Sequence, residues 1–290
     1  MKKLRAKNTN KNISQKGDFT RRRFIKTTSF AAGTMAIISS PLFAKTFSNS
    51  DPIAQTKYGK ISGVKQSGMN IFKGVRYGAD TSNRRFQPAF LPEKWNGIMQ
   101  AKEYGASSPQ GRRDENISED CLFLNIWTPG LNDGRKRPIM FYIHGGAYSN
   151  GSGSSALYDG TNICLRGDVV LITVNHRLNA FGYLYLGLLG GSEFASSGNV
   201  GQLDLIMALE WVKEHALEFG GDPDNVTVFG QSGGGAKIAS LMATPASKGL
   251  FHRAWTMSGQ QVTAAGPRAA TQRAERLLEA LDLTPKELYK

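Results

Sequence analysis

Hydrophobic and polar residues alternate from position 53 to position 77, and glycines interrupt the alternation at short intervals. A period of two places one side of a strand in the core and the other side in solvent. The pattern therefore predicts short antiparallel strands. Residues 78–118 are polar, irregular and broken by prolines, and we expect no regular element there.

Short hydrophobic runs follow, separated by polar and glycine-containing segments. The first three occupy residues 122–127, 139–143 and 169–174 and have the length and composition of strands buried on both faces. Two further strands are predicted at residues 225–229 and 254–257.

Helical periodicity appears between and after the later strands. Residues 200–219 form the clearest helix, which Gly220 and Gly221 end. Its apolar side is expected to consist of Leu203, Ile206, Met207, Leu209, Trp211, Val212 and Leu217. Further helices are predicted from Ser232 to about Met242 and from Ala269 to Leu281. Strands that alternate with helices predict an α/β fold, with a mostly parallel sheet and helices on both faces.

Charge adds a distinct N-terminal segment to this picture. The chain has 290 residues and a formal net charge of +13, which by itself suggests a partner such as nucleic acid or a membrane surface. Residues 1–26, however, hold ten basic side chains and one acidic side chain, a net charge of +9. The rest of the chain keeps only +4 of the total, so we expect no nucleic-acid partner.

The basic segment ends in Thr20–Lys26, which contains three consecutive arginines before Phe24, and an uncharged, mildly apolar run then extends to Ala44. This layout is typical of an export signal, and the paired arginines before an aromatic residue resemble the twin-arginine type. We expect residues 1–44 to address the chain to the twin-arginine export machinery. The mature segment, residues 45–290, would then be periplasmic or secreted. The alternative is a basic disordered arm followed by one core helix.

The chain has two cysteines, Cys121 and Cys164. They are too few for a disulfide scaffold, and they lack the paired spacing of a zinc site. A disulfide between them stays open. No motif predicts a metal ion or an organic cofactor.

The strongest chemical signal is Gly230-Gln231-Ser232-Gly233-Gly234, which lies directly between a predicted strand and a predicted helix. A sharp strand-to-helix turn exposes the serine as a nucleophile. Glycines at 230 and 234 let the strand and the helix pack closely, and the helix directs free N–H groups toward the reacting centre. The alternative is a glycine-rich turn that only packs a helix on a sheet.

A second motif, His144-Gly145-Gly146-Ala147-Tyr148, directly follows the predicted strand at 139–143. Acyl transfer builds negative charge on a carbonyl oxygen, and backbone N–H groups aimed at that oxygen stabilise it. We expect Gly145, Gly146 and Gly233 to form this oxyanion hole. An ordinary glycine turn after a strand is the alternative.

With these motifs in place, the chain resembles the N-terminal portion of the type-B carboxylesterases, the family that includes cholinesterases and bacterial carboxylesterases. The resemblance implies an α/β-hydrolase fold, hydrolysis of a small-molecule carboxylic ester, Ser232 as the nucleophile and no cofactor. It rests on further ordered motifs at residues 72–77, 85–88, 118–125, 175–179, 198–201, 219–223 and 257–259.

The resemblance also implies a departure. In this family a carboxylate residue and then a histidine follow the serine and complete the triad. After Ser232 the chain has one histidine, His252, at a position that is structural in the family. We therefore expect a domain truncated after the nucleophile turn and the following strand, with little or no turnover alone. A complementing C-terminal polypeptide and a non-catalytic binding module are the alternatives.

Overall fold

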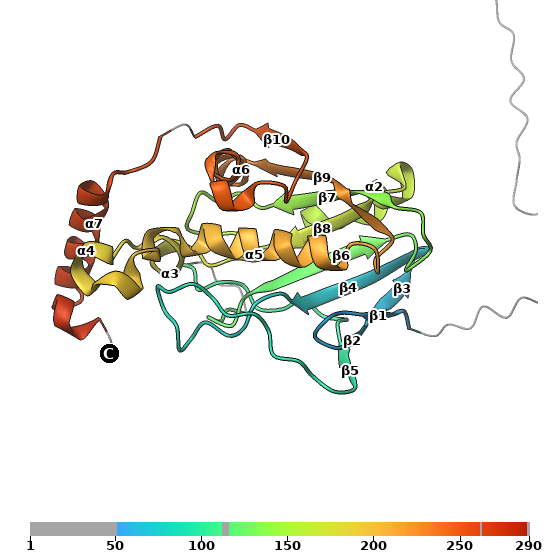
Figure 1. Cartoon of the computed structure of the whole chain (residues 1–290), viewed down its shortest axis with the longest axis horizontal. Helices are drawn as coiled ribbons and strands as arrows, with labels where there is room; N and C mark the ends of the chain where they lie inside the picture. The colour runs from blue at the N-terminus through green and yellow to red at the C-terminus, as the bar shows by residue number, and fades with distance from the viewer. Residues whose placement is uncertain (1–50, 112–115, 262, 289–290) are drawn as a thin grey trace, which may run out of the picture. The chain divides into compact units, whose positions relative to one another are not determined.

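The computed structural model describes residues 51–111, 116–261 and 263–288. The expected export signal at residues 1–44 lies outside the described residues. The main element is a seven-stranded sheet with the order β10-β9-β7-β8-β6-β4-β3 (Figure 1). Its strands are β3 (Val64–Gln66), β4 (Met69–Arg76), β6 (Phe123–Thr128), β7 (Arg137–Ile143), β8 (Val170–Val174), β9 (Gly221–Gln231) and β10 (Arg253–Met257).

The sheet is mixed, with one parallel and one antiparallel part. Strands β8, β7, β9 and β10 pair in parallel. Strand β6 pairs antiparallel with both β8 and β4, and β4 pairs antiparallel with β3. Strand β4 therefore points the same way as the parallel group, and only β6 and β3 of these seven strands oppose it. The expectation of a mostly parallel sheet is confirmed in this sense.

The two faces of the sheet carry different helices. Phe141 and Ile172 face a core that also contains residues of α5 (Val200–His215) and α6 (Gly233–Ala243). Met140 and Leu171, one position earlier on the same strands, belong to the opposite face, which α2 (Thr161–Gly167) covers. Each fully buried aliphatic or aromatic side chain contributes about 1.5–3 kcal/mol to stability. The expectation of helices on both faces is confirmed.

A smaller sheet of three short strands has the order β1-β2-β5, with β1 (Ile53–Gln55), β2 (Lys60–Ser62) and β5 (Ile98–Gln100). Strands β1 and β2 pair antiparallel, as the alternating pattern predicts, whereas β5 pairs in parallel with β2. The expectation of no regular element at residues 78–118 is therefore wrong for β5. This strand has three residues, and both Ile98 and Gln100 are exposed, so it has no periodicity to detect.

The long helix is shorter than expected. Helix α5 ends at His215, and Glu218, Phe219 and Gly220 then donate backbone hydrogen bonds to the carbonyl three residues earlier. Leu217 is 54% exposed in this tightened segment, so its expected place on the apolar side is wrong. Helix α6 agrees with the sequence to within one residue. The final helix, α7 (Pro267–Ala280), begins two residues earlier than expected.

Three short helices escape the hydrophobic pattern, namely α2, α3 (Asn179–Tyr183) and α4 (Gly187–Gly190). Helix α4 lies beside α7 (Figure 1), and Leu186, Phe194 and Ala274 form a small core between these segments. At the opposite edge of the sheet from β3, strand β10 has a neighbour on one side only among the described residues, and its Trp255 is 56% exposed. No helix in the described ranges is long and apolar enough to cross a membrane.

Candidate active site

Ser232 occupies the sharp turn between β9 and α6. Its φ of +54° with a ψ of −121° is a sparsely populated backbone conformation, which costs a non-glycine residue about 1–3 kcal/mol. The turn is held from the neighbouring strand, because the Ser232 N–H donates to the Met257 carbonyl at 2.7 Å. The side chain is half-buried, and its hydroxyl makes no hydrogen bond within the described ranges. The predicted nucleophile therefore lies in a strained strand-to-helix turn with an unengaged hydroxyl.

The two outer glycines of the motif lie where β7 meets this turn. A methyl group placed on Gly234 would lie 2.0 Å from the Ile143 carbonyl oxygen, and one on Gly230 would lie 2.6 Å from the same oxygen. Neither distance leaves room for a side chain, since ordinary carbon–oxygen contacts are about 3.3 Å or longer. That Gly230 and Gly234 serve to let the strand and the helix pack closely stays a prediction, and the close approach of the backbones supplies its physical reason.

The loop from His144 to Tyr148 touches the same turn. A methyl group on Gly145 would lie 3.5 Å from the Ser232 Cβ, and one on Gly233 would lie 2.6 Å from the Ala147 nitrogen. Within the described ranges, no acceptor takes a hydrogen bond from the N–H groups of Gly145, Gly146, Ala147 or Gly233. The structure thus brings the predicted oxyanion residues close to Ser232 and leaves their N–H groups free for a ligand in this part of the chain.

Sequence reasoning did not single out Ala147. Its nitrogen lies against Gly233, and its φ of +53° is left-handed although it is not a glycine. Gly146, with a φ of +91°, accepts hydrogen bonds from the N–H groups of Ser149 and Asn150, so the loop turns back on itself there. The Ala147 N–H is consequently a further candidate donor. Its position inside the glycine motif is the one signal in the sequence that points to it.

Two buried histidines lie behind this loop. The His144 Nδ1 donates to the Gly145 carbonyl at 2.8 Å, and the His144 ring stacks on His176 with a centroid separation of 4.7 Å. Burial, and after it the charge of Lys237, lowers the pKa of His144 to about 3. Burial also lowers the pKa of His176. Both rings are therefore neutral at neutral pH, which suits a structural role.

None of the four histidines forms a hydrogen bond with the Ser232 hydroxyl. Beyond His144 and His176, the Nε2 of His215 accepts from the Lys57 N–H at 3.0 Å, and its Nδ1 lies 2.7 Å from the Trp211 carbonyl. The Nδ1 of His252 accepts from the Val226 N–H at 3.2 Å. The described ranges therefore contain no histidine placed as a general base for Ser232.

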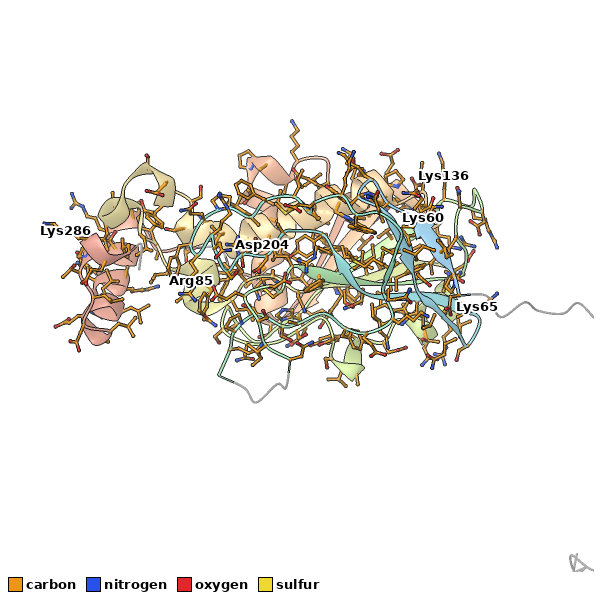
Figure 2. All side chains as sticks on the ribbon, turned by 90° about the horizontal axis from the view of Figure 1, so that it is seen from below. Lys60, Lys65, Arg85, Lys136, Asp204 and Lys286 are labelled. Carbon is orange, nitrogen blue, oxygen red and sulfur yellow. The ribbon has the colours of Figure 1, made fainter. Side chains whose placement is uncertain are left out.

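A buried ion pair fixes the segment that follows β8. Arg177 donates from Nε and Nη2 to the two carboxylate oxygens of Asp204 at 2.8 and 2.6 Å, and its own N–H donates to Asp204 at 3.0 Å. Its Nη1 donates to the Gln87 carbonyl at 2.7 Å. Figure 2 shows Asp204 within the body of the molecule and Arg85 nearer its periphery. Arg177 and Asp204 therefore tie three segments together and are not free for chemistry.

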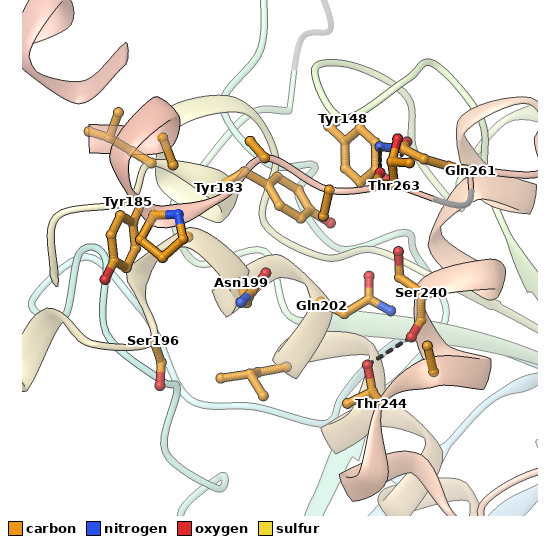
Figure 3. Close-up of a pocket in the computed structure, with 18 of the residues that line it drawn as sticks. Tyr148, Tyr183, Tyr185, Ser196, Asn199, Gln202, Ser240, Thr244, Gln261 and Thr263 are labelled. Atoms are coloured by element: carbon orange, nitrogen blue, oxygen red, sulfur yellow. Dashed lines mark hydrogen bonds between the residues drawn. The ribbon is translucent and has the colours of Figure 1, made fainter. Parts of the chain in front are cut away.

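A cavity of about 1160 Å³ opens beside the loop (Figure 3). Tyr148 lines it, with its hydroxyl donating to Gln261 at 3.2 Å and its ring meeting the Tyr183 ring edge-on at 4.8 Å. Helices α5 and α6 supply the polar side chains of Gln202 and Ser240. Ser232 itself is not part of the lining. The cavity is large enough for a small organic molecule next to the loop that carries the free N–H groups.

The described residues show no grouping of side chains that would hold a metal ion. Cys121 and Cys164 are both free and buried, so the disulfide that the sequence left open is not formed. Cys164 lies on α2, against the face opposite the one that contains Cys121. Burial raises the pKa of Cys164 to about 12, which makes it an unreactive thiol.

Residues 50–288 match the model of the carboxylesterase family. The para-nitrobenzyl esterase of Bacillus subtilis (strain 168) is 40% identical over 249 residues, which are 82% of this chain and 50% of that protein. The chain spans about half the length of the curated relatives it matches.

Solved structures show the same coverage. The carboxylesterase EST55 of Geobacillus stearothermophilus superposes with a TM-score of 0.79 at 42% identity, over 82% of this chain and 50% of that one. An esterase of Clostridium hathewayi, described as able to hydrolyse aliphatic aromatic polyesters, gives a TM-score of 0.74 at 44% identity, over 81% and 49%. The chain thus has the α/β-hydrolase fold over about half of these structures, and it belongs to the carboxylesterase family.

Proposed function

We propose that this chain carries the nucleophile and the oxyanion hole of a serine carboxylic ester hydrolase. The observation that carries the proposal is the left-handed turn at Ser232, whose unengaged hydroxyl lies next to the free N–H groups of Gly233 and of the Gly145–Ala147 loop. A turn needed only for packing has no reason to hold a serine in strained backbone. Family membership supports the same chemistry.

The proposed reaction has two steps. The Ser232 Oγ loses its proton to a base and bonds to the ester carbonyl carbon, and the N–H groups stabilise the charge on the carbonyl oxygen. The C–O bond to the alcohol then breaks, and the alcohol leaves with a proton. Water attacks the acyl-enzyme in the same way and releases the carboxylic acid and the serine. The substrate is a small-molecule ester, and the described residues by themselves do not supply the base.

We infer that a further polypeptide segment supplies the base and its carboxylate partner. Within the part of the chain that the structure describes, strand β10 is paired on one side only, and its exposed Trp255 stacks on Phe229 at 6.3 Å. An unpaired edge next to exposed aromatic rings is a surface on which further strands pair. Co-expression with the half of the Bacillus subtilis relative that this chain does not match should raise ester turnover. Trp255→Lys should cancel that gain, and an unchanged rate with both halves present would contradict the inference.

A fluorophosphonate probe tests the nucleophile without requiring turnover. With the complementing half present, the Ser232 Oγ gives its proton to the base of that half and bonds to phosphorus while fluoride leaves. The protein thereby gains a covalent label that mass spectrometry assigns to one residue. Wild type should be labelled at Ser232, and Ser232→Ala should not be labelled. Ser258→Ala is the matched control, because Ser258 also follows a strand directly and has a φ of +53°. Absence of labelling in wild type with the complementing half present would refute the nucleophile and favour a non-catalytic binding module.

We also propose that the chain is exported by the twin-arginine route. The support is the sequence alone: a net charge of +9 over residues 1–26, followed by an uncharged run that ends at Ala44. A reporter fused after residue 44 should leave the cytoplasm of a bacterial host. Replacing Arg21 and Arg22 with lysine should retain it, whereas export that continues in this variant would contradict the proposed route.

A further inference from the structure

Lys237 is a buried lysine one helical turn beyond the nucleophile. It lies on α6, five residues after Ser232, and none of its surface is exposed. Lysine is almost never fully buried without a partner of opposite charge. Within the described ranges, no carboxylate forms an ion pair with Lys237. Its Nζ instead donates to the Ala147 carbonyl at 2.7 Å.

The residue that Lys237 contacts is the strained one in the loop. Ala147 has a left-handed φ of +53°, which its Cβ disfavours, so an outside contact is needed to hold that conformation. A methyl group placed on Gly233 would lie 2.3 Å from the Ala147 carbonyl oxygen, which accepts the hydrogen bond from Lys237. The same methyl group would lie 2.6 Å from the Ala147 nitrogen. A change in the rotation of this residue would therefore change where its N–H points relative to Ser232.

We propose that Lys237 is a positioning residue for the oxyanion hole: its ammonium holds the Ala147 carbonyl and thereby aims the Ala147 N–H at the site beside Ser232. The proposal rests on the proposed esterase function. It assigns Lys237 no contact with substrate, because the ammonium acts through the backbone of the loop. The carboxylesterase chemistry would then depend on a charged group outside the triad.

No carboxylate among the described residues compensates the charge of Lys237. His144 on the loop and His176 after β8 are the titratable groups whose pKa values its charge lowers, and both are neutral. The ring of Tyr148 faces the Nζ at 5.3 Å, and the Lys237 carbonyl accepts from Gln202 of α5 at 2.9 Å. Burial lowers the pKa of Lys237 to about 7. The ammonium and the neutral amine are therefore both populated near neutral pH.

This equilibrium gives the proposal a pH signature. Below pH 7 the ammonium makes a charge-assisted hydrogen bond, which is roughly twice as strong as the bond from the neutral amine. The hold on Ala147 should weaken as pH rises through about 7. A histidine base supplied by the complementing half has the opposite effect, since it becomes active as pH rises. Dividing the wild-type rate by the rate of a variant without the lysine cancels the shared histidine and isolates Lys237.

The experiment measures the rate of fluorophosphonate labelling of Ser232 between pH 6 and 9, in the full chain co-expressed with the complementing half that supplies the base. Lys237→Met keeps the length of the side chain and removes its charge. It should label about tenfold more slowly than wild type at pH 6, a loss smaller than the 10²–10³ of a deleted oxyanion donor. The ratio should shrink toward unity by pH 9. Equal rates, or a ratio that does not change with pH, would overturn the proposal.

Two variants separate positioning from a general loss of structure. Lys213→Met is the matched control, because the Lys213 Nζ also donates to a backbone carbonyl, that of Gly249 at 3.1 Å, and it should label like wild type. Ala147→Gly is the rescue, because glycine adopts a left-handed φ without a Cβ clash. In the Ala147→Gly background, Lys237→Met should slow the labelling of Ser232 by less than threefold. A full tenfold loss there would overturn the proposal.

A second measurement does not depend on any reaction. The Tyr148 N–H belongs to the peptide whose carbonyl accepts from Lys237, so its amide resonance should titrate with a midpoint near pH 7 in wild type. It should not titrate in Lys237→Met. If the probe fails to label wild type, the proposed function fails, and this resonance still decides whether Lys237 holds the loop. A Tyr148 resonance that does not change between pH 6 and 9 would overturn the proposal whatever the reactivity.

Discussion

Replacing Gly234 with alanine should destabilise the fold at the point where the nucleophile turn meets β7. The added methyl would lie 2.0 Å from the Ile143 carbonyl oxygen, 3.0 Å from its carbon and 3.1 Å from the His144 oxygen. All three are backbone atoms, so no flexible side chain can move aside. The end of β7 and the start of α6 must separate by about 1 Å to restore ordinary contact distances.

The magnitude follows from two opposing effects. Overpacking of this kind costs about 1–3 kcal/mol, and the upper end applies because only backbone is available to move. Alanine is better than glycine within a helix by about 0.5–1 kcal/mol, which offsets part of that cost. The net loss should be about 2 kcal/mol of unfolding free energy. For a domain of this size, that lowers the Tm by about 4–8 °C.

Thermal and urea unfolding, followed by circular dichroism, measure this loss. Gly235→Ala is the control, since it adds a methyl at the next position of the same helix, where the nearest atom is 3.3 Å away. It should lie within about 1 kcal/mol of wild type. Gly234→Ala should also slow labelling of Ser232 by tenfold or more, because His144 leads directly into the oxyanion loop. If Gly234→Ala were as stable and as reactive as Gly235→Ala, the close-packing explanation would be refuted.

Two further predictions concern buried charge. Burial lowers the pKa of Lys237 to about 7, from its ordinary value of 10.5. Between these two pH values the unfolded chain binds more protons than the native chain, so wild-type stability should rise with pH in this window. Lys237→Met lacks this titration, and its Tm relative to wild type should be highest at pH 7 and below and should fall steadily to pH 10. Asp204→Asn leaves the buried Arg177 without its counter-ion and should cost about 3–5 kcal/mol in urea unfolding. Glu119→Gln, which breaks the partly exposed pair with Arg85, should cost less than about 1 kcal/mol, and equal losses for the two variants would contradict this explanation.

The strands and the main helices were predictable because their signals are local. Three hydrophobic runs mark β6, β7 and β8, and each side chain in β8 is buried, as expected for a strand covered on both faces. The failures are also physical. Strand β5 has one partly buried side chain, Met99, between two exposed ones, which is too short a pattern to detect. Helix α5 ends in turns whose N–H groups donate to the carbonyl three residues earlier, and such turns accept the same residues as a helix.

The candidate site was predictable to the level of its motifs. Ser232 lies in the strand-to-helix turn that the sequence indicates, with the Gly145–Gly146 loop next to it. The predicted set of N–H donors was incomplete, because it left out Ala147. The direction of an N–H depends on φ and ψ, and Ala147 adopts a left-handed φ that its residue type disfavours. The pattern of residues therefore indicates which loop forms the site, but not which peptide of that loop faces the serine.

The sequence by itself determined the family and the order of the main strands and helices, and it indicated Ser232 as the candidate nucleophile, because hydrophobic period and glycine–serine motifs act between close neighbours in the chain. Only the tertiary structure decided that Lys237 is buried and that it donates to Ala147, a residue 90 positions earlier. Lysine in a helix is ordinarily a solvent-exposed residue, and nothing in its neighbours along the chain distinguishes this one. The environment of Lys237 forms because the loop after β7, residues 144–148, packs against α6. Burial by these distant segments changes the pKa and the role of the lysine.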